Sequence, residues 1–186
     1  YQRLFSELEI QGVKYCSWKN NHLLERESNG DGDIDLLVHP LQYHEFERLL
    51  FSNGFIRAES SISEYPFIKH YYCYDECLNK FGHLHVYFKL VTGDSHLKNY
   101  RLPIEDKVLN ASYISDFSIR EAHPFHQAEI YMLRKYIKSS SLFGLFLLFR
   151  ESEDYKSEFN YIIGRIAELG AKSAPSLFKF DVGFSK

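Results

Sequence analysis

Cysteine is scarce in this chain of 186 residues, which bears on both its redox compartment and its metal chemistry. The three cysteines, Cys16, Cys73 and Cys77, are an odd number, and no signal-peptide pattern accompanies them. Sparse, unpaired cysteines are typical of a reducing compartment, so we expect a cytoplasmic protein. Cys73 and Cys77 lie four residues apart, but no second Cys/His pair follows at zinc-ribbon spacing, which argues against a structural zinc site.

Long apolar runs and an excess of basic charge are also missing. The longest apolar run, residues 142–149, is far shorter than the roughly 20 residues that cross a bilayer, so no membrane span is predicted. The formal net charge of −3 gives no support for a nucleic-acid partner, because nucleic-acid-binding domains normally carry a basic excess. Hydrophobic residues make up 45% of the chain and charged residues 25%, which is an ordinary globular balance. Because the chain starts at Tyr1 rather than at a methionine, we expect a piece of a longer protein with further domains.

One stretch, Gly-Asp-Gly-Asp-Ile-Asp-Leu-Leu-Val at residues 30–38, combines acidic residues with the pattern of a buried strand. Side chains alternate along a strand, so Asp33 and Asp35 project to one face, close enough together to hold a metal ion. Gly30 and Gly32 permit a tight turn and a close approach of a ligand to the backbone. A solvated turn capped by aspartates is the alternative interpretation, but the apolar residues that follow Asp35 favour a strand. An EF-hand loop is excluded, because no glutamate stands at its twelfth position.

A second alternating stretch, residues 83–88, predicts a strand with His83, His85 and Tyr87 on one face. These histidines are ordinary strand residues in one interpretation. In the other, their face coincides with that of Asp33 and Asp35, and a histidine serves as a metal ligand or proton carrier. A shift of one residue in register would turn the histidines away from the aspartates.

Periodicity and breakers predict the remaining elements. Helices are expected over residues 2–10, within 20–28, over 40–52 and over 104–111, and strands over 13–18, 55–59, 65–74 and 117–120. From Pro124 onward the spacing is helical, with further helices over 142–150 and 154–169. The sequence therefore predicts an α/β (α+β) fold with a mixed, mainly antiparallel sheet flanked by helices over residues 1–122, and a helical segment over 123–186.

The stretch Gly-Asp-Ile-Asp-Leu-Leu-Val at residues 32–38 resembles the core strand of the nucleotidyltransferase superfamily, which includes DNA polymerase β-like enzymes, aminoglycoside nucleotidyltransferases and minimal antitoxin-type enzymes. In that superfamily an Asp-x-Asp/Glu pair binds the metal ions that activate a nucleoside triphosphate. Residues 15–19, Tyr-Cys-Ser-Trp-Lys, resemble the Leu-Lys-Gly variant of a branch some of whose members accompany bacterial surface-polysaccharide genes.

The resemblance implies a metal-dependent transfer of a nucleotidyl group from a nucleoside triphosphate to a hydroxyl or phosphate acceptor, a small molecule or a glycan. It implies Mg²⁺ or Mn²⁺ at Asp33 and Asp35, with His85 in the place of the family's third carboxylate. The nucleotide would be bound by five further residues, Ser17, Lys19, Gly30, Gly32 and Lys89. The sequence departs from the family in lacking the phosphate-cradling Gly-Ser pair and an evident third carboxylate.

Two other functions fit these residues. One is a nucleotidyltransferase-like module without turnover, which binds a nucleotide or sugar phosphate within a larger polysaccharide-assembly protein. The other is a different metal-dependent phosphotransferase or hydrolase built on Asp33, Asp35, His83 and His85. For any of the three, the two aspartates should repel each other without a cation, so neutralising both should leave the stability of the domain unchanged or slightly raised.

Overall fold

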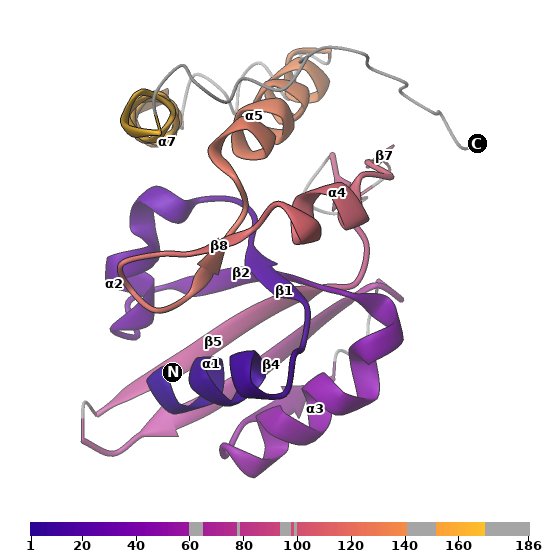
Figure 1. Cartoon of the computed structure of the whole chain (residues 1–186), viewed down its shortest axis with the longest axis vertical. Coiled ribbons are helices and arrows are strands. Elements are labelled where there is room, and N and C mark those ends of the chain that lie inside the picture. The colour runs from indigo at the N-terminus through magenta and orange to yellow at the C-terminus, as the bar shows by residue number, and fades with distance from the viewer. Residues whose placement is uncertain (60–64, 78, 94–97, 99, 141–151, 170–186) are drawn as a thin grey trace. The chain divides into compact units, whose positions relative to one another are not determined.

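The computed structural model describes residues 1–59, 65–77, 79–93, 98, 100–140 and 152–169, which form two compact units (Figure 1). The first unit consists of Tyr1–Leu90 and Ile104–Ala122, and the second of Val91–Pro103 and His123–Lys186. Among the predicted elements, the helix over 142–150 lies outside the described residues.

A seven-stranded sheet forms the centre of the first unit, in the order β3-β4-β5-β2-β1-β9-β8. Its strands are β1 (Tyr15–Ser17), β2 (Asp33–Val38), β3 (Ile56–Ala58), β4 (Ile68–Asp75), β5 (Lys80–Tyr87), β8 (Tyr113–Ile114) and β9 (Arg120–Glu121). Strand β2 pairs antiparallel with β1 and parallel with β5, and β4 joins β5 as an antiparallel hairpin. The mixed sheet with its helices confirms the predicted α+β class.

Helices α1 (Gln2–Ile10) and α3 (Tyr43–Ser52) pack on one face of this sheet, as Figure 1 shows. Each helix carries its buried apolar residues at helical spacing, because only one side of it faces the core. The core that they share with β2 and β5 includes Leu4, Phe5 and Leu8 of α1, Phe46, Leu49 and Leu50 of α3, Ile34, Leu36 and Val38 of β2, and Leu84, Val86 and Phe88 of β5. The alternate residues of β2 and β5, which include both aspartates and both histidines, therefore lie on the opposite face.

Short helices complete the first unit. They are the 3₁₀ turns η1 (Asn21–Leu23) and η2 (Pro40–Gln42) and the α-helices α2 (Leu24–Ser28) and α4 (Glu105–Asn110). The predicted strand over residues 117–120 is wrong for most of its length. Ser118 adopts a φ of +58°, and its amide donates to the Ser115 carbonyl, so this segment is the turn that joins β8 to β9.

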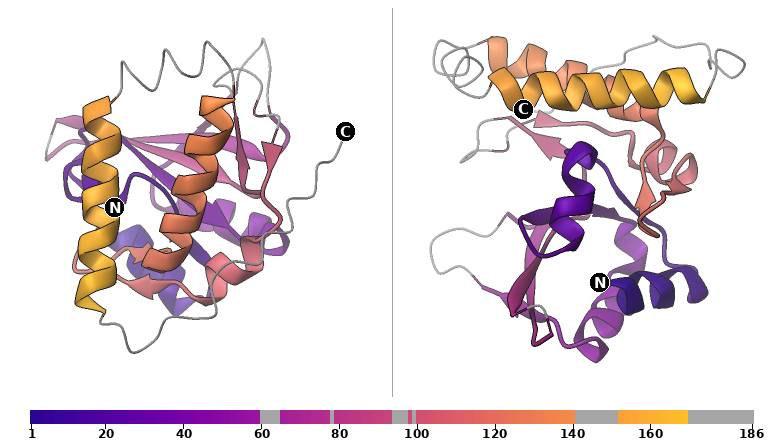
Figure 2. Two further views of the ribbon diagram at one scale, coloured as in Figure 1. Left: turned by 90° about the horizontal axis from the view of Figure 1, so that it is seen from above. Right: turned by 90° about the vertical axis from the view of Figure 1, so that its left-hand side faces the viewer.

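The second unit contains the small hairpin of β6 (Val91–Thr92) and β7 (Tyr100–Arg101) and two long helices, α5 (Pro124–Ser139) and α7 (Ser152–Glu168). Figure 2 shows α5 and α7 side by side. Tyr131 of α5 packs against Tyr155 and Ile162 of α7, and the largely buried Arg134 and Glu158 form an ion pair of 2.9 Å. None of the helices in the described ranges is long and apolar enough to cross a membrane.

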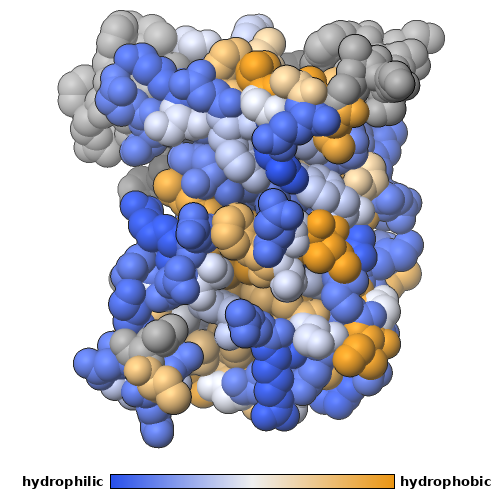
Figure 3. Space-filling model, turned by 60° about the vertical axis from the view of Figure 1, so that its left-hand side comes forward, coloured by the Kyte–Doolittle hydropathy of each residue, from blue (hydrophilic) through white to orange (hydrophobic). Residues whose placement is uncertain are grey.

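The side of the molecule shown in Figure 3 carries no large continuous apolar patch among the described residues. Hydrophilic residues predominate there, and apolar residues occur in separate groups among them. Scattered exposed apolar residues are normal for globular proteins.

Candidate metal centre

The parallel pairing of β2 with β5 brings three potential metal ligands together on the polar face of the sheet. In this register Asp33 lies opposite His83, and Asp35 lies opposite His85. One ligand atom from each of Asp33, Asp35 and His85 lies within 4.8 Å of the other two. The position of His85 beside the aspartates agrees with the face predicted from strand alternation.

Asp35 is the buried member of this trio, with 2% of its side chain exposed. Its Oδ1 lies 2.9 Å from Lys19 Nζ and 3.1 Å from His85 Nδ1, and Asn20 Nδ2 donates to its Oδ2 at 3.2 Å. Burial alone would raise the pKa of this carboxyl, but the charge of Lys19 and the hydrogen bonds from His85 and Lys19 outweigh it and hold the pKa at about 2. The carboxylate is therefore ionised at neutral pH, and protein groups meet both of its oxygens.

Asp33 lies at the start of β2 and is the accessible carboxylate of the pair, with 46% of its side chain exposed. Its Oδ2 lies 3.7 Å from the same His85 nitrogen. The nearby His85 lowers the pKa of Asp33 below its usual value, against the opposing effects of burial and of the charge on Asp35. Asp33 is thus the carboxylate that an incoming ligand reaches first.

Three histidines, His70, His83 and His85, share this face, and their environments shift their pKa values in different directions. Burial lowers the pKa of His85, but the nearby carboxylates of Asp33 and Asp35 more than compensate, so its pKa is raised. Burial lowers the pKa of His83, and burial together with the charges of His85 and His83 lowers that of His70 to about 4. His70 and His83 are therefore neutral at pH 7, and their rings meet through His70 Nδ1 and His83 Nε2 at 3.0 Å.

Lys19, which follows the end of β1, forms an ion pair with Asp35. Its ammonium group donates to the Tyr87 hydroxyl at 3.3 Å and lies 5.2 Å from the ring centres of both Trp18 and Tyr87. The Trp18 and Tyr87 rings pack edge to face with their centres 5.0 Å apart, so the two rings next to the Lys19 ammonium group support each other. Only 14% of the Lys19 side chain is exposed, so its charge acts within a partly desolvated site.

Of the other residues that the resemblance assigned to nucleotide binding, Ser17 and Lys89 make their described contacts outside the trio. The hydroxyl of Ser17 is buried and donates to Asn21 Oδ1, and Lys89 Nζ lies over the Phe67 ring at 3.6 Å. Among the described contacts, neither residue touches Asp33, Asp35 or His85. Gly30 and Gly32 do lie in the turn that leads into β2, with φ of +81° and +139°.

Glu27 of α2 was not singled out by the sequence, yet it lies beside this turn. A Cβ placed on Gly32 would stand 3.0 Å from Glu27 Cγ and 3.8 Å from Glu27 Oε1. The glutamate is only 4% exposed. Burial and the negative charges of Asp35 and Asp33 raise its pKa to about 8. The only sequence signal for it was its place in the polar helix just before the glycine-aspartate turn.

The contact between Gly32 and Glu27 leads to a testable expectation. We expect Gly32→Ala to lower the free energy of unfolding by about 1–3 kcal/mol, because a φ of +139° is strained for alanine and the new Cβ crowds Glu27. Gly54→Ala is the matched control, since Gly54 also has a positive φ of +80° but has nothing within 4 Å of an added Cβ. Urea unfolding of both variants measures the difference. An equal cost for the two would show that the contact with Glu27 contributes nothing.

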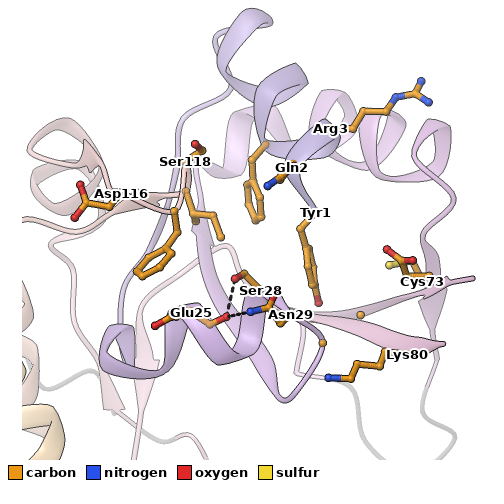
Figure 4. Close-up of a pocket in the computed structure, with 16 residues that line it drawn as sticks. Tyr1, Gln2, Arg3, Glu25, Ser28, Asn29, Cys73, Lys80, Asp116 and Ser118 are labelled. Atoms are coloured by element: carbon orange, nitrogen blue, oxygen red, sulfur yellow. Dashed lines mark hydrogen bonds between the residues drawn. The ribbon is translucent and has the colours of Figure 1, made fainter. Parts of the chain in front are cut away.

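A cavity of about 630 Å³ lies elsewhere in the first unit and contains none of the trio. Its walls come from the start of α1, from α2 and the turn after it, from the β4–β5 hairpin and from the β8–β9 turn (Figure 4). Glu25 contributes its carbonyl, which accepts hydrogen bonds from Ser28 and Asn29. The lining mixes Arg3 and Lys80 with acidic and aromatic groups, so it shows no single chemical preference.

The donor set of Asp33, Asp35 and His85 fits a divalent cation. Carboxylate oxygens suit Mg²⁺ and Mn²⁺, and an added imidazole nitrogen moves the preference toward Mn²⁺ or Zn²⁺.

Asn20, which reaches Asp35 from the end of β1, is a further site residue that the sequence analysis missed. Its φ of +57° is tolerated by asparagine, so the Asn-Asn pair after Lys19 was the available signal.

Comparisons of this chain with protein-family models, curated proteins and solved structures found no match.

Proposed function

We propose that the protein is a metal-dependent nucleotidyltransferase, which transfers a nucleotidyl group from a nucleoside triphosphate to a hydroxyl or phosphate acceptor. The observation that carries this proposal is the convergence of Asp33, Asp35 and His85, whose ligand atoms lie within 4.8 Å of one another on the polar face of the sheet. The alternating Asp-Ile-Asp pattern at the start of a core strand is the feature of the resemblance on which the proposal also depends.

In this proposal Asp33, Asp35 and His85 hold the cation, Mg²⁺ or Mn²⁺. When bound, it supplies positive charge that offsets the charge developing on the attacking and leaving oxygens. Asp33 would bind the cation through its exposed carboxylate. Lys19 and Asn20 fix the position of the Asp35 carboxylate. Lys19 is also placed to contact phosphate as a point charge, because its ammonium group lies 2.9 Å from Asp35 and 5.2 Å from the ring centres of Trp18 and Tyr87.

The reaction that this arrangement would serve is a displacement at phosphorus. An oxygen of the acceptor forms a bond to the α-phosphorus, and the bond from that phosphorus to the bridging oxygen breaks. Pyrophosphate leaves, and the proton of an attacking hydroxyl passes to solvent or to a nearby base. We further propose, from the resemblance alone, that the acceptor is a small molecule or glycan of surface-polysaccharide synthesis.

Release of pyrophosphate tests the proposed function. We expect the protein to release pyrophosphate from one of the four common nucleoside triphosphates when Mg²⁺ or Mn²⁺ is present and to stop when EDTA is added. A mixture of candidate acceptors, sugar phosphates and free sugars among them, should accompany each triphosphate. Asp31→Asn serves as the control for charge removal, because Asp31 pairs with Lys80 on the surface at 2.8 Å rather than with the trio. Loss of activity in Asp31→Asn but not in Asp33→Asn would contradict the assignment.

One observation favours a second candidate, a binding module of the same kind without turnover. Asp35 already meets Lys19, His85 and Asn20, so the protein's own groups offset its charge without a cation. Calorimetry distinguishes the two functions. A wild-type protein that binds a nucleotide or sugar phosphate but neither Mn²⁺ nor Mg²⁺, and releases no pyrophosphate, is a module; Mn²⁺ binding that Asp33→Asn abolishes favours the enzyme.

A further inference from the structure

The sheet face that carries the metal centre continues past it as a row of aromatic side chains on the β4–β5 hairpin. The register pairs Tyr72 with His83 and Tyr74 with Phe81. Alternation along the strands puts these four side chains on the same face as Asp33, which lies opposite His83. The rings of the first pair stack with their centres 4.3 Å apart, and those of the second pair lie 5.1 Å apart. We call the four residues the aromatic strip.

The outer pair of the strip is largely accessible to solvent. Phe81 is 67% exposed and Tyr74 is 50% exposed. Strand β2 begins at Asp33, so the part of the hairpin that carries the outer pair extends beyond the end of β2. Apolar rings are unfavourable in water, and exposed rings that gather beside a candidate site mark a surface for a ligand.

The strip and Lys19 lie at opposite ends of the metal centre. The Lys19 ammonium group contacts Asp35 and the Tyr87 hydroxyl. The strip begins at His83, four residues before Tyr87 on β5 and opposite Asp33. The two aspartates and His85 therefore separate the proposed phosphate contact from the aromatic rings.

This order assigns a direction to the proposed reaction. The attacking and leaving oxygens lie roughly in line through the α-phosphorus. Because Lys19 is the proposed phosphate contact, the leaving pyrophosphate lies at its end of the centre, and the acceptor attacks from the end of the strip. A sugar ring suits that position, since its apolar C–H face stacks on an aromatic ring while its hydroxyl groups stay free to attack.

We propose that the aromatic strip binds a sugar ring of the acceptor, an oligosaccharide or glycoside that presents a hydroxyl group to the metal centre. This inference rests on the proposed function. Phe81 and His85 are four residues apart on β5, which is about 13 Å, so an acceptor longer than one ring reaches from the outer pair to the centre. Its hydroxyl oxygen bonds to the α-phosphorus, the bond from that phosphorus to the bridging oxygen breaks, pyrophosphate leaves, and the hydroxyl proton passes to solvent.

Saturation-transfer NMR with maltose, lactose and diacetylchitobiose, without metal or nucleotide, tests the strip directly. We expect saturation to pass to the ring protons of at least one disaccharide. Phe81→Leu should weaken that binding by about 10-fold, because leucine keeps an apolar side chain but has no ring face. Phe81→Tyr keeps the ring and should bind as the wild type does. Phe51→Leu is the matched control, since Phe51 of α3 is also half exposed but lies outside the strip.

Two results would overturn the inference. A cross-strand aromatic pair can serve only to stabilise its hairpin. In that case Phe81→Leu lowers the midpoint of thermal unfolding, and none of the three disaccharides binds the wild type. The four nucleoside monophosphates should be tested in parallel. Binding of a monophosphate that Phe81→Leu weakens, with no binding of a disaccharide, would assign the strip to the nucleobase instead.

A Mn²⁺ titration separates this inference from the proposed function. Phe81→Leu should keep the wild-type Mn²⁺ affinity, because the side chain of Phe81 is not among the ligands of the centre. If Mn²⁺ binds and the disaccharides do not, the role of the strip is overturned and the metal centre stands. If a disaccharide binds but neither Mn²⁺ nor Mg²⁺ does, the proposed function is overturned, and the strip is a sugar site without the role of an acceptor site.

Discussion

Replacing Asp35 with asparagine is expected to lower the free energy of unfolding of the metal-free protein by about 2–4 kcal/mol at pH 7, because it leaves the charge of Lys19 in a partly buried site without its partner. The expected cost is at the low end for a broken buried pair, since 14% of the Lys19 side chain remains exposed to solvent. Asp33→Asn should cost less than about 1 kcal/mol, because the Asp33 side chain is half exposed. Urea unfolding in EDTA measures both variants.

The contribution of Asp35 to the free energy of unfolding should decrease as the pH is lowered. The pKa of Asp35 lies at about 2 in the folded protein and at an ordinary 3.8 in the unfolded chain. The folded state therefore binds the proton less readily, and the stabilisation is fully present above the unfolded value and is lost as the pH falls through the folded value. The part that disappears corresponds to about 2 kcal/mol. The difference between wild type and Asp35→Asn should accordingly shrink between pH 5 and pH 2, and a constant difference would contradict the ion pair.

This result would also correct an expectation from the sequence. Two neighbouring aspartates were expected to repel each other, so that neutralising both would leave stability unchanged or slightly raised. The charge of Asp35 does raise the pKa of Asp33, but Lys19 and His85 lie within 3.1 Å of Asp35 Oδ1 and offset the charge of Asp35 without a cation. The double variant should therefore be less stable than the wild type.

Asp33→Asn is expected to abolish the proposed activity with little effect on the fold. Removing the accessible ligand carboxylate should reduce pyrophosphate release by on the order of 10³-fold or more, since the cation supplies several kcal/mol of the stabilisation of the transition state. Rates with the active triphosphate and Mn²⁺ titrations should both be measured, with Asp31→Asn as the control.

The two measurements on Asp33→Asn check each other. Loss of turnover with loss of Mn²⁺ binding places the cation at Asp33. Wild-type Mn²⁺ affinity together with undiminished turnover would remove Asp33 from the site and with it the proposed function.

Local patterns in the sequence determined the α+β class and most of the secondary structure. Period-two alternation placed Asp33 and Asp35 on one face of β2, and His83 and His85 on one face of β5. Helical spacing predicted α1 and α3 because their buried residues recur at intervals of three and four. These features depend on neighbouring residues alone. The turn at Ser118 was missed, because a positive φ at serine has no reliable local signal.

Only the tertiary structure decided which strands meet and in what register. Strands β2 and β5 are separated along the chain by α3, β3 and β4, and no local pattern states that they pair in parallel with Asp35 opposite His85. The same pairing set the charges of the site, because Lys19 reaches Asp35 across β1 and Glu27 is buried beside Gly32. The pKa values of Asp35 and Glu27 depend on burial and on charges distant in sequence. The sequence singled out Asp35 but not Glu27, and only the three-dimensional arrangement determined the ionisation of both.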